Sequence, residues 1–91
     1  HKTKNDLSAE TRAQVAEILN NRLADVSDLK SQAKQAHWNV KGIHFRELHL
    51  LFDEVATAAE EYTDLIAERI TALGGTALGT VRIAAQRSSL N

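Results

Sequence analysis

The sequence contains no proline, and this absence constrains the fold of the 91-residue chain more than any other feature. Proline and glycine are the residues that most strongly interrupt helices. The four glycines fall in only two places, at position 42 and between positions 74 and 79. Two long segments can therefore each form one continuous helix. Because only four aromatic residues are present, a β sandwich is disfavoured, and the sequence predicts an all-α protein.

A helix is predicted over residues 8–41. Ser8 is a favourable N-cap, and Glu10 lies in the first turn, where the helix dipole favours a negative charge. Gly42 can adopt the left-handed conformation that ends a helix. Apolar residues recur at helical spacing along one stripe, at Val15, Ile18, Leu19, Val26, Leu29, Ala33, Ala36 and Val40.

A second helix is predicted over residues 44–73, ending at Gly74 and Gly75. The connection between the two helices is short, so they should form an antiparallel hairpin. Residues 74–91 are expected to begin a crossover connection, as a loop with at most one short helical turn. The second apolar stripe consists of Leu48, Leu51, Val55, Ala58, Ala59, Tyr62, Leu65, Ile66 and Leu73.

Two amphipathic helices bury only a narrow seam, whereas a closed helical core needs three or four. We therefore expect a further pair of helices, supplied by a missing C-terminal half or by another chain.

Composition excludes several classes of function. The formal net charge of −1 gives no basic field that would attract nucleic acid. Without cysteine, disulfides and thiolate metal sites are excluded within these residues. No apolar segment approaches the roughly 20 residues of a membrane span, and no signal peptide is visible. A soluble, cytoplasmic protein with a polar N-terminal arm at residues 1–7 is expected.

Four potential metal ligands share one strip of the second helix. A helix turns by about 100° per residue, so the angle of each side chain around the helix axis can be given relative to Asp53. His49 lies at about −40°, Asp64 at about +20° and Glu68 at about +60°. The apolar stripe is centred roughly opposite, so these groups should face away from the hairpin core. An ordinary solvated polar face is the alternative interpretation.

The axial spacing of these ligands points to a second subunit. His49 and Asp53 are one turn apart, as are Asp64 and Glu68, but about 22 Å separates the two pairs. Metal–ligand bonds are about 2 Å long, so one ion cannot bind both pairs of one helix. An antiparallel copy related by a two-fold axis would bring complementary pairs together, giving two equivalent sites.

Two residues near the hairpin turn remain ambiguous on spacing alone. His37 precedes the end of the first helix by one turn and can approach His49, but on spacing alone a histidine packed in the core is the better interpretation. Trp38 lies on another side of the helix and is most simply a packing residue.

Three segments resemble the Dps proteins, the mini-ferritins of starved bacterial cells. They are KQAHWNVKG at 34–42, FRELHLLFDE at 45–54 and DLIAERITALGGTALGT at 64–80. The spacing of His37, His49, Asp53, Asp64 and Glu68 is similar to the ferroxidase signature of that family. The resemblance implies half of a ferritin-like four-helix bundle, within a cytoplasmic homo-oligomeric cage of twelve subunits.

The family function implied is oxidation of Fe(II), with hydrogen peroxide as oxidant, and storage of ferric mineral. His37 and His49 would be metal ligands from one subunit, with Asp53 as a ligand or its partner, and Asp64 and Glu68 would come from the neighbour. Nitrogen and oxygen donors also suit zinc or other divalent metals. Trp38 would stand beside the centre and scavenge oxidising equivalents. Ile43 replaces the proline common in the family, which should loosen the turn.

Two other functions remain open. Some Dps proteins compact DNA in the nucleoid through lysine-rich arms, and here the arm offers Lys2 and Lys4. The chain could also be a structural fragment without catalytic activity.

Overall fold

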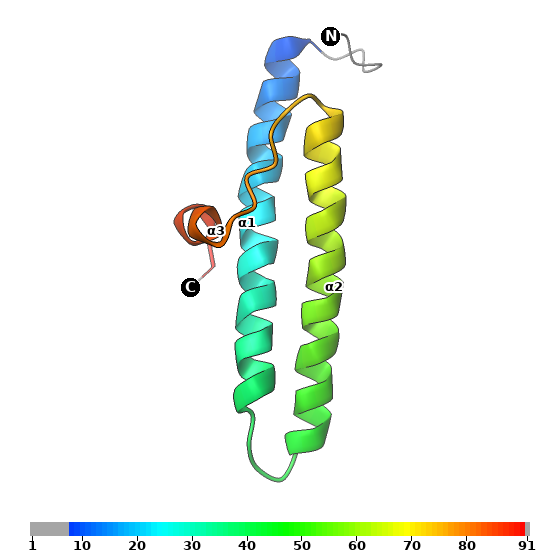
Figure 1. The fold of residues 1–91 in the computed structure, drawn as a ribbon, viewed down its shortest axis with the longest axis vertical. Helices are drawn as coiled ribbons and strands as arrows, with labels where there is room; N and C mark the ends of the chain where they lie inside the picture. The colour runs from blue at the N-terminus through cyan, green and yellow to red at the C-terminus, as the bar shows by residue number, and fades with distance from the viewer. Residues whose placement is uncertain (1–7, 91) are drawn as a thin grey trace.

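The computed structural model describes residues 8–90, which form two long antiparallel helices and one short helix (Figure 1). Helix α1 is Ala9–Asn39, α2 is Phe45–Ala72 and α3 is Val81–Arg87. The molecule is a rod with a longest extent of 56 Å. This arrangement confirms the predicted all-α hairpin. The arm carrying Lys2 and Lys4 lies outside the described residues.

The ends of α1 follow from local chemistry. The Ser8 hydroxyl accepts a hydrogen bond from the backbone N–H of Thr11 at 3.1 Å, which satisfies a free donor of the first turn. At the other end Val40 is extended, with φ −67° and ψ 139°, so α1 stops at Asn39, two residues before the predicted end. Gly42 has φ +103°, a conformation that L side chains rarely adopt, and it turns the chain towards α2.

The seam between α1 and α2 is built mainly from small side chains. Because alanine places little bulk between helix backbones, these residues allow the two helices to pack closely. Large buried apolar side chains fill the seam near the end that carries the crossover, where Leu23, Ile70 and Leu73 lie. The buried alanines of the long helices are Ala16, Ala24, Ala33, Ala56 and Ala59.

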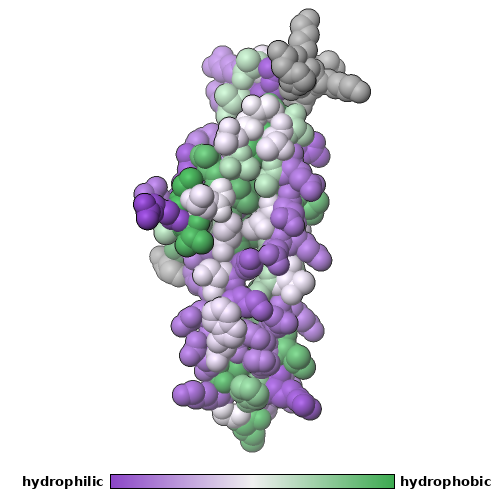
Figure 2. All heavy atoms as spheres, in the orientation of Figure 1, coloured by the Kyte–Doolittle hydropathy of each residue, from purple (hydrophilic) through white to green (hydrophobic). Residues whose placement is uncertain are grey.

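Much of each predicted apolar stripe remains exposed in this chain. On α1, Ile18 is 60% exposed, and on α2 Tyr62 and Leu65 are both 59% exposed. The reason is geometric, since the seam follows the alanines and leaves the larger side chains to one side of it. Figure 2 shows apolar side chains beside α3 and at the hairpin turn, among polar ones. No helix in residues 8–90 is long and apolar enough to cross a membrane.

One asparagine fastens the crossover to α1. Asn20 is 5% exposed, and its amide donates to the carbonyl oxygen of Thr76 at 3.1 Å. Its side-chain oxygen accepts from the backbone N–H of Leu78 at 2.9 Å. Asn20 therefore satisfies two backbone groups of a segment that has no regular structure of its own.

The crossover continues into α3, where a short turn at most was expected. Thr80 caps this helix, its hydroxyl accepting from the backbone N–H of Ile83 at 3.2 Å. The buried Ala84 packs α3 against α1. Amphipathic periodicity could not define a helix of seven residues, because two turns are too short to display a repeat.

Three acidic side chains of α1 hold the end of α3. Arg87 pairs with Glu17 at 2.9 Å, and the hydroxyl of Ser88 donates to Asp28 at 2.7 Å. The backbone N–H of Ser89 donates to Asp25 at 2.6 Å. This last hydrogen bond lowers the pKa of Asp25, although partial desolvation opposes the effect.

Replacing Asn20 should destabilise the fold without changing the helices themselves. In Asn20→Ala two backbone groups each lose a part-buried hydrogen bond, so the free energy of unfolding should fall by about 1–3 kcal/mol. Urea denaturation followed by circular dichroism measures this change. Gln14→Ala, at an exposed position of the same helix, is the control and should be nearly neutral. Equal stability of the two variants would contradict this role for Asn20.

Candidate metal centre

Two histidines face each other where the hairpin turns. His37 lies in the last turn of α1 and His49 in the first turns of α2. Their rings stack with centroids 3.6 Å apart and an interplanar angle of 23°. The contact is reciprocal, since Nδ1 of His37 lies 2.5 Å from the carbonyl oxygen of His49, and Nδ1 of His49 lies 2.8 Å from that of His37.

These contacts define the hydrogen positions on both rings. A carbonyl oxygen can only accept, so each Nδ1 must carry the hydrogen and donate it. In a neutral ring, Nε2 then holds the lone pair. Histidines that bind metals usually donate their other N–H to a carbonyl or carboxylate in this way. The pair is therefore prepared to present two Nε2 ligands from adjacent helices.

The sequence allowed His37 to be either a metal ligand or a histidine packed in the core, and its surroundings bear on that choice. Its side chain is only partly buried and is satisfied by a backbone group of the other helix. Phe45 extends the stack, with its ring centroid 5.2 Å from that of His49. The structure thus brings His37 and His49 together, as their places beside the turn suggested.

Asp53 lies one turn after His49 and is paired with a lysine of α1. Lys34 Nζ is 2.8 Å from Asp53 Oδ1. This hydrogen bond and the lysine charge lower the pKa of Asp53, slight desolvation opposes them, and the two histidines add a smaller lowering contribution. Asp53 is therefore ionised at neutral pH, with one of its oxygens already occupied.

Asp64 and Glu68 occupy a distant part of the same helix. Both are exposed, and α2 runs without interruption from Phe45 to Ala72, so the rise per residue places them about 22 Å from His49 and Asp53. Within residues 8–90, no group of three or more histidine, aspartate or glutamate side chains is arranged to hold a metal ion. The structure therefore brings His37, His49 and Asp53 to one end of α2 and leaves Asp64 and Glu68 apart from them.

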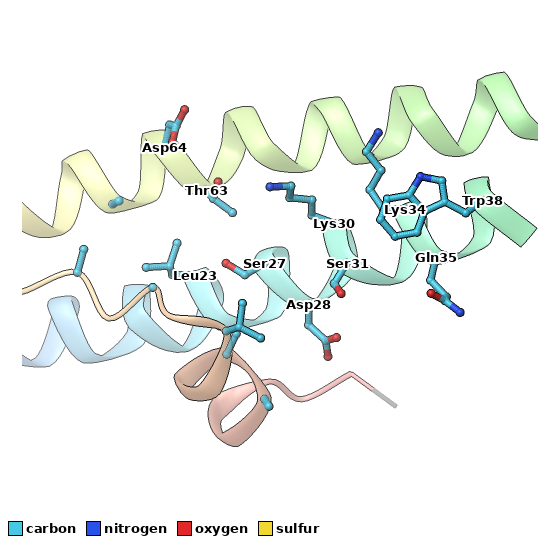
Figure 3. A pocket seen from close by; sticks show the side chains of 16 residues that line it. Leu23, Ser27, Asp28, Lys30, Ser31, Lys34, Gln35, Trp38, Thr63 and Asp64 are labelled. Atoms are coloured by element: carbon cyan, nitrogen blue, oxygen red, sulfur yellow. The ribbon is translucent and has the colours of Figure 1, made fainter.

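A groove of about 700 Å³ is bounded by α1, α2 and α3 (Figure 3). Asp64 and Trp38 both line it, at different ends. Trp38 is 68% exposed, so it packs little within this chain, contrary to the simplest expectation for a tryptophan. The groove also contains Lys30 and Lys34, which extend from α1 towards α2 in Figure 3.

These two lysines were missed by the sequence reasoning. Lys30 Nζ lies 3.0 Å from Glu60 Oε1, a second ion pair between α1 and α2 beside the one formed by Lys34. The signal was present, because Lys30, Lys34 and His37 follow each other at spacings of four and three on one helix face. Only the packing of the helices shows which acids they reach.

Comparison with known proteins identifies the family. Residues 16–89, which include all five predicted ligands, match the ferritin-like domain family. The DNA protection during starvation protein of Agrobacterium fabrum is 47% identical over 90 residues, covering 99% of this chain and 56% of that protein. The chain belongs to the Dps proteins of the ferritin-like family. It spans about half the length of the curated relatives it matches.

Solved structures of Dps proteins share the fold. DpsC from Streptomyces coelicolor superposes with a TM-score of 0.92 at 36% identity, over 98% of this chain and 52% of that one. The structure titled Dps from Microbacterium arborescens in the high iron form has a TM-score of 0.81 at 36% identity, over 98% of this chain and 57% of that one. The predicted fold class, a hairpin forming half of a ferritin-like four-helix bundle, is confirmed.

The Lys34–Asp53 pair gives a testable pH dependence. Since the folded pKa of Asp53 is lowered, the pair stabilises the fold above the ordinary pKa of 3.8, and this contribution is lost as the pH falls through the lowered value. In Lys34→Gln the pKa of Asp53 should move up towards 3.8. A carboxyl-carbon NMR titration measures the shift, with Lys41→Gln as control. An unchanged pKa of Asp53 in Lys34→Gln would show that the ion pair does not form in solution.

Proposed function

We propose that this chain supplies both halves of an Fe(II)-oxidising centre that is completed between two subunits. One subunit would contribute Nε2 of His37 and His49 with the carboxylate of Asp53, and the other would contribute Asp64 and Glu68. The observation that carries the proposal is the reciprocal histidine pair, which leaves two imidazole nitrogens ready for a metal on a site whose remaining acids lie about 22 Å away.

The donor set suits iron as substrate. Imidazole nitrogen and carboxylate oxygen bind Fe(II) well, and the carboxylates stabilise the additional charge of Fe(III). Zinc, manganese or cobalt would compete for the same donors. The structure of Dps from Microbacterium arborescens in the high iron form supports iron as the metal handled by this family.

Hydrogen peroxide is the proposed oxidant. Two Fe(II) ions each give one electron to peroxide, its O–O bond breaks, and two protons complete two molecules of water. Because both electrons reach the same peroxide molecule, no hydroxyl radical is released, whereas reduction of peroxide by a single Fe(II) would release one. For Asp53 to bind iron with the oxygen now held by Lys34, that lysine must move aside, so it would act as the counter-charge of the empty site. Trp38, in the same groove, is proposed to donate an electron to any strong oxidant that escapes.

The proposed assembly is a twelve-subunit cage that stores the ferric product. The chain covers 56% of the Agrobacterium relative, so we propose that two further helices complete each bundle. The exposed Ile18, Tyr62 and Leu65 give those helices an apolar surface to cover.

Replacing both histidines should abolish fast oxidation. In the assembled full-length protein, His37→Ala with His49→Ala removes both imidazole ligands, and the initial rate of Fe(II) oxidation by peroxide should fall at least tenfold. Stopped-flow absorbance of the ferric product measures the rate. His44→Ala, at the exposed turn position between them, is the matched control and should keep the rate. Oxidation at the normal rate in the double variant would refute the catalytic assignment, provided sedimentation shows an intact cage.

DNA binding is the second candidate, favoured by the similarity to the DNA protection during starvation protein of Agrobacterium fabrum. Lys2 and Lys4 in the N-terminal arm are the proposed contacts, and DNA affinity that depends on phosphate contacts falls steeply with salt. A gel-shift titration at low salt should show weak binding that disappears near physiological salt and in Lys2→Ala with Lys4→Ala. Binding that persists in this double variant would exclude the arm as the DNA contact.

A further inference from the structure

The pairing of the two half-sites also determines where a two-fold axis must cross α2, and this inference rests on the proposed function. If His49 faces Glu68 of a second copy and Asp53 faces its Asp64, the two pairs share one midpoint, between Ala58 and Ala59. Antiparallel helices related by a two-fold axis cross that axis at such a midpoint. The axis therefore passes close to the centre of α2, about two turns from each half-site.

Glu60 lies on the ligand strip next to this axis. Measured around the helix axis from Asp53, Glu60 lies at about −20°, within the range of the four ligands, and Thr57 lies at about +40°. Glu60 of one copy would face Thr57 of the other, so the two Glu60 backbones would be offset by three residues, or about 4.5 Å along the helices. The two carboxylates would therefore approach each other within the interface.

Two carboxylates brought together in an interface repel each other unless an opposite charge is near. Lys30 supplies such a charge in each subunit, with Nζ 3.0 Å from Glu60 Oε1. In the single chain this pair is a surface contact, since the lysine side chain is 39% exposed and the glutamate 58%. An exposed ion pair of this kind contributes little to the stability of one chain, so we look for its effect in the interface between two chains.

We infer that Lys30 is the counter-charge that allows two copies of this chain to meet at Glu60, so that the Lys30–Glu60 pairs form a neutral four-residue cluster on the two-fold axis. The groove extends the same surface, since Lys30, Asp64 and Val81 all line it and Val81 on α3 is 87% exposed. The partner is thus a second copy of this chain, and the cluster separates its two metal centres.

Charge variants of the assembled full-length protein test this inference. Lys30→Gln leaves two uncompensated carboxylates at the axis, so the protein concentration at half dissociation should rise at least tenfold at low salt. Added salt should reduce the defect, because it screens the repulsion. The double variant Lys30→Gln with Glu60→Gln removes both charges and should restore assembly to within about threefold of the wild type. Sedimentation velocity measures the dissociation, and Lys41→Gln is the control.

Two outcomes would overturn the inference: wild-type assembly of Lys30→Gln at low salt, or failure of the double variant to restore it while circular dichroism shows intact helices. Fe(II) oxidation is measured separately. Loss of oxidation in the histidine variant with unaltered assembly of Lys30→Gln would keep the proposed function and reject the axial cluster. Dissociation of Lys30→Gln combined with normal oxidation in the histidine variant would do the reverse.

Engineered cysteines test the same geometry if Lys30→Gln folds poorly. These 91 residues contain no cysteine, so Thr57→Cys and Glu60→Cys can each be introduced alone. In a mixture of the two variants, mild oxidation should produce covalent dimers in greater yield than in either variant alone, because the facing positions 57 and 60 lie closer than two copies of either position. Equal yields in the mixture and in the single variants would exclude the facing of residues 57 and 60.

Discussion

The close approach of α1 and α2 along a seam of alanines is the constraint on which the rest of the structure depends. Ala33 and Ala56 place almost no side chain between the two backbones in the half of the hairpin nearer the turn. As a result, the rings of His37 and His49 stack and each reaches the carbonyl group of the other. Larger residues in the seam would separate the helices and break these reciprocal contacts, because packed interiors do not absorb added volume freely.

Features with a period could be predicted from the sequence. The two helices follow from uninterrupted apolar repeats, and the strip shared by His49, Asp53, Asp64 and Glu68 follows from helical periodicity. The expectation that this strip faces away from the hairpin core was wrong for His49 and Asp53, which contact His37 and Lys34 of α1. The axial separation of the pair His49 and Asp53 from the pair Asp64 and Glu68 also follows, because the rise per residue of a helix is fixed. These features depend on one helix at a time, so they can be predicted without knowing how the helices pack.

Features that depend on contacts between helices could not be predicted. The partners of Lys30 and Lys34 are set by the rotation of α1 against α2, which the sequence does not specify. The same is true of the bonds that Asn20 makes to the crossover, which join residues more than 50 positions apart. Even the apolar stripes were only partly informative, because the seam follows alanine rather than the larger residues such as Tyr62.

The lysine held by Asp53 has a consequence for how a cation would enter such a site. An empty cluster of acids accumulates negative charge, which strains the fold and attracts any passing cation. Here a positive group already resides next to the carboxylate, 2.8 Å away. Filling the proposed site would then be an exchange of one cation for another, so a divalent ion would add only one net positive charge beside the carboxylate. Selectivity would depend on which ion can compete with a tethered ammonium group, a demand that favours multivalent metals over sodium or potassium.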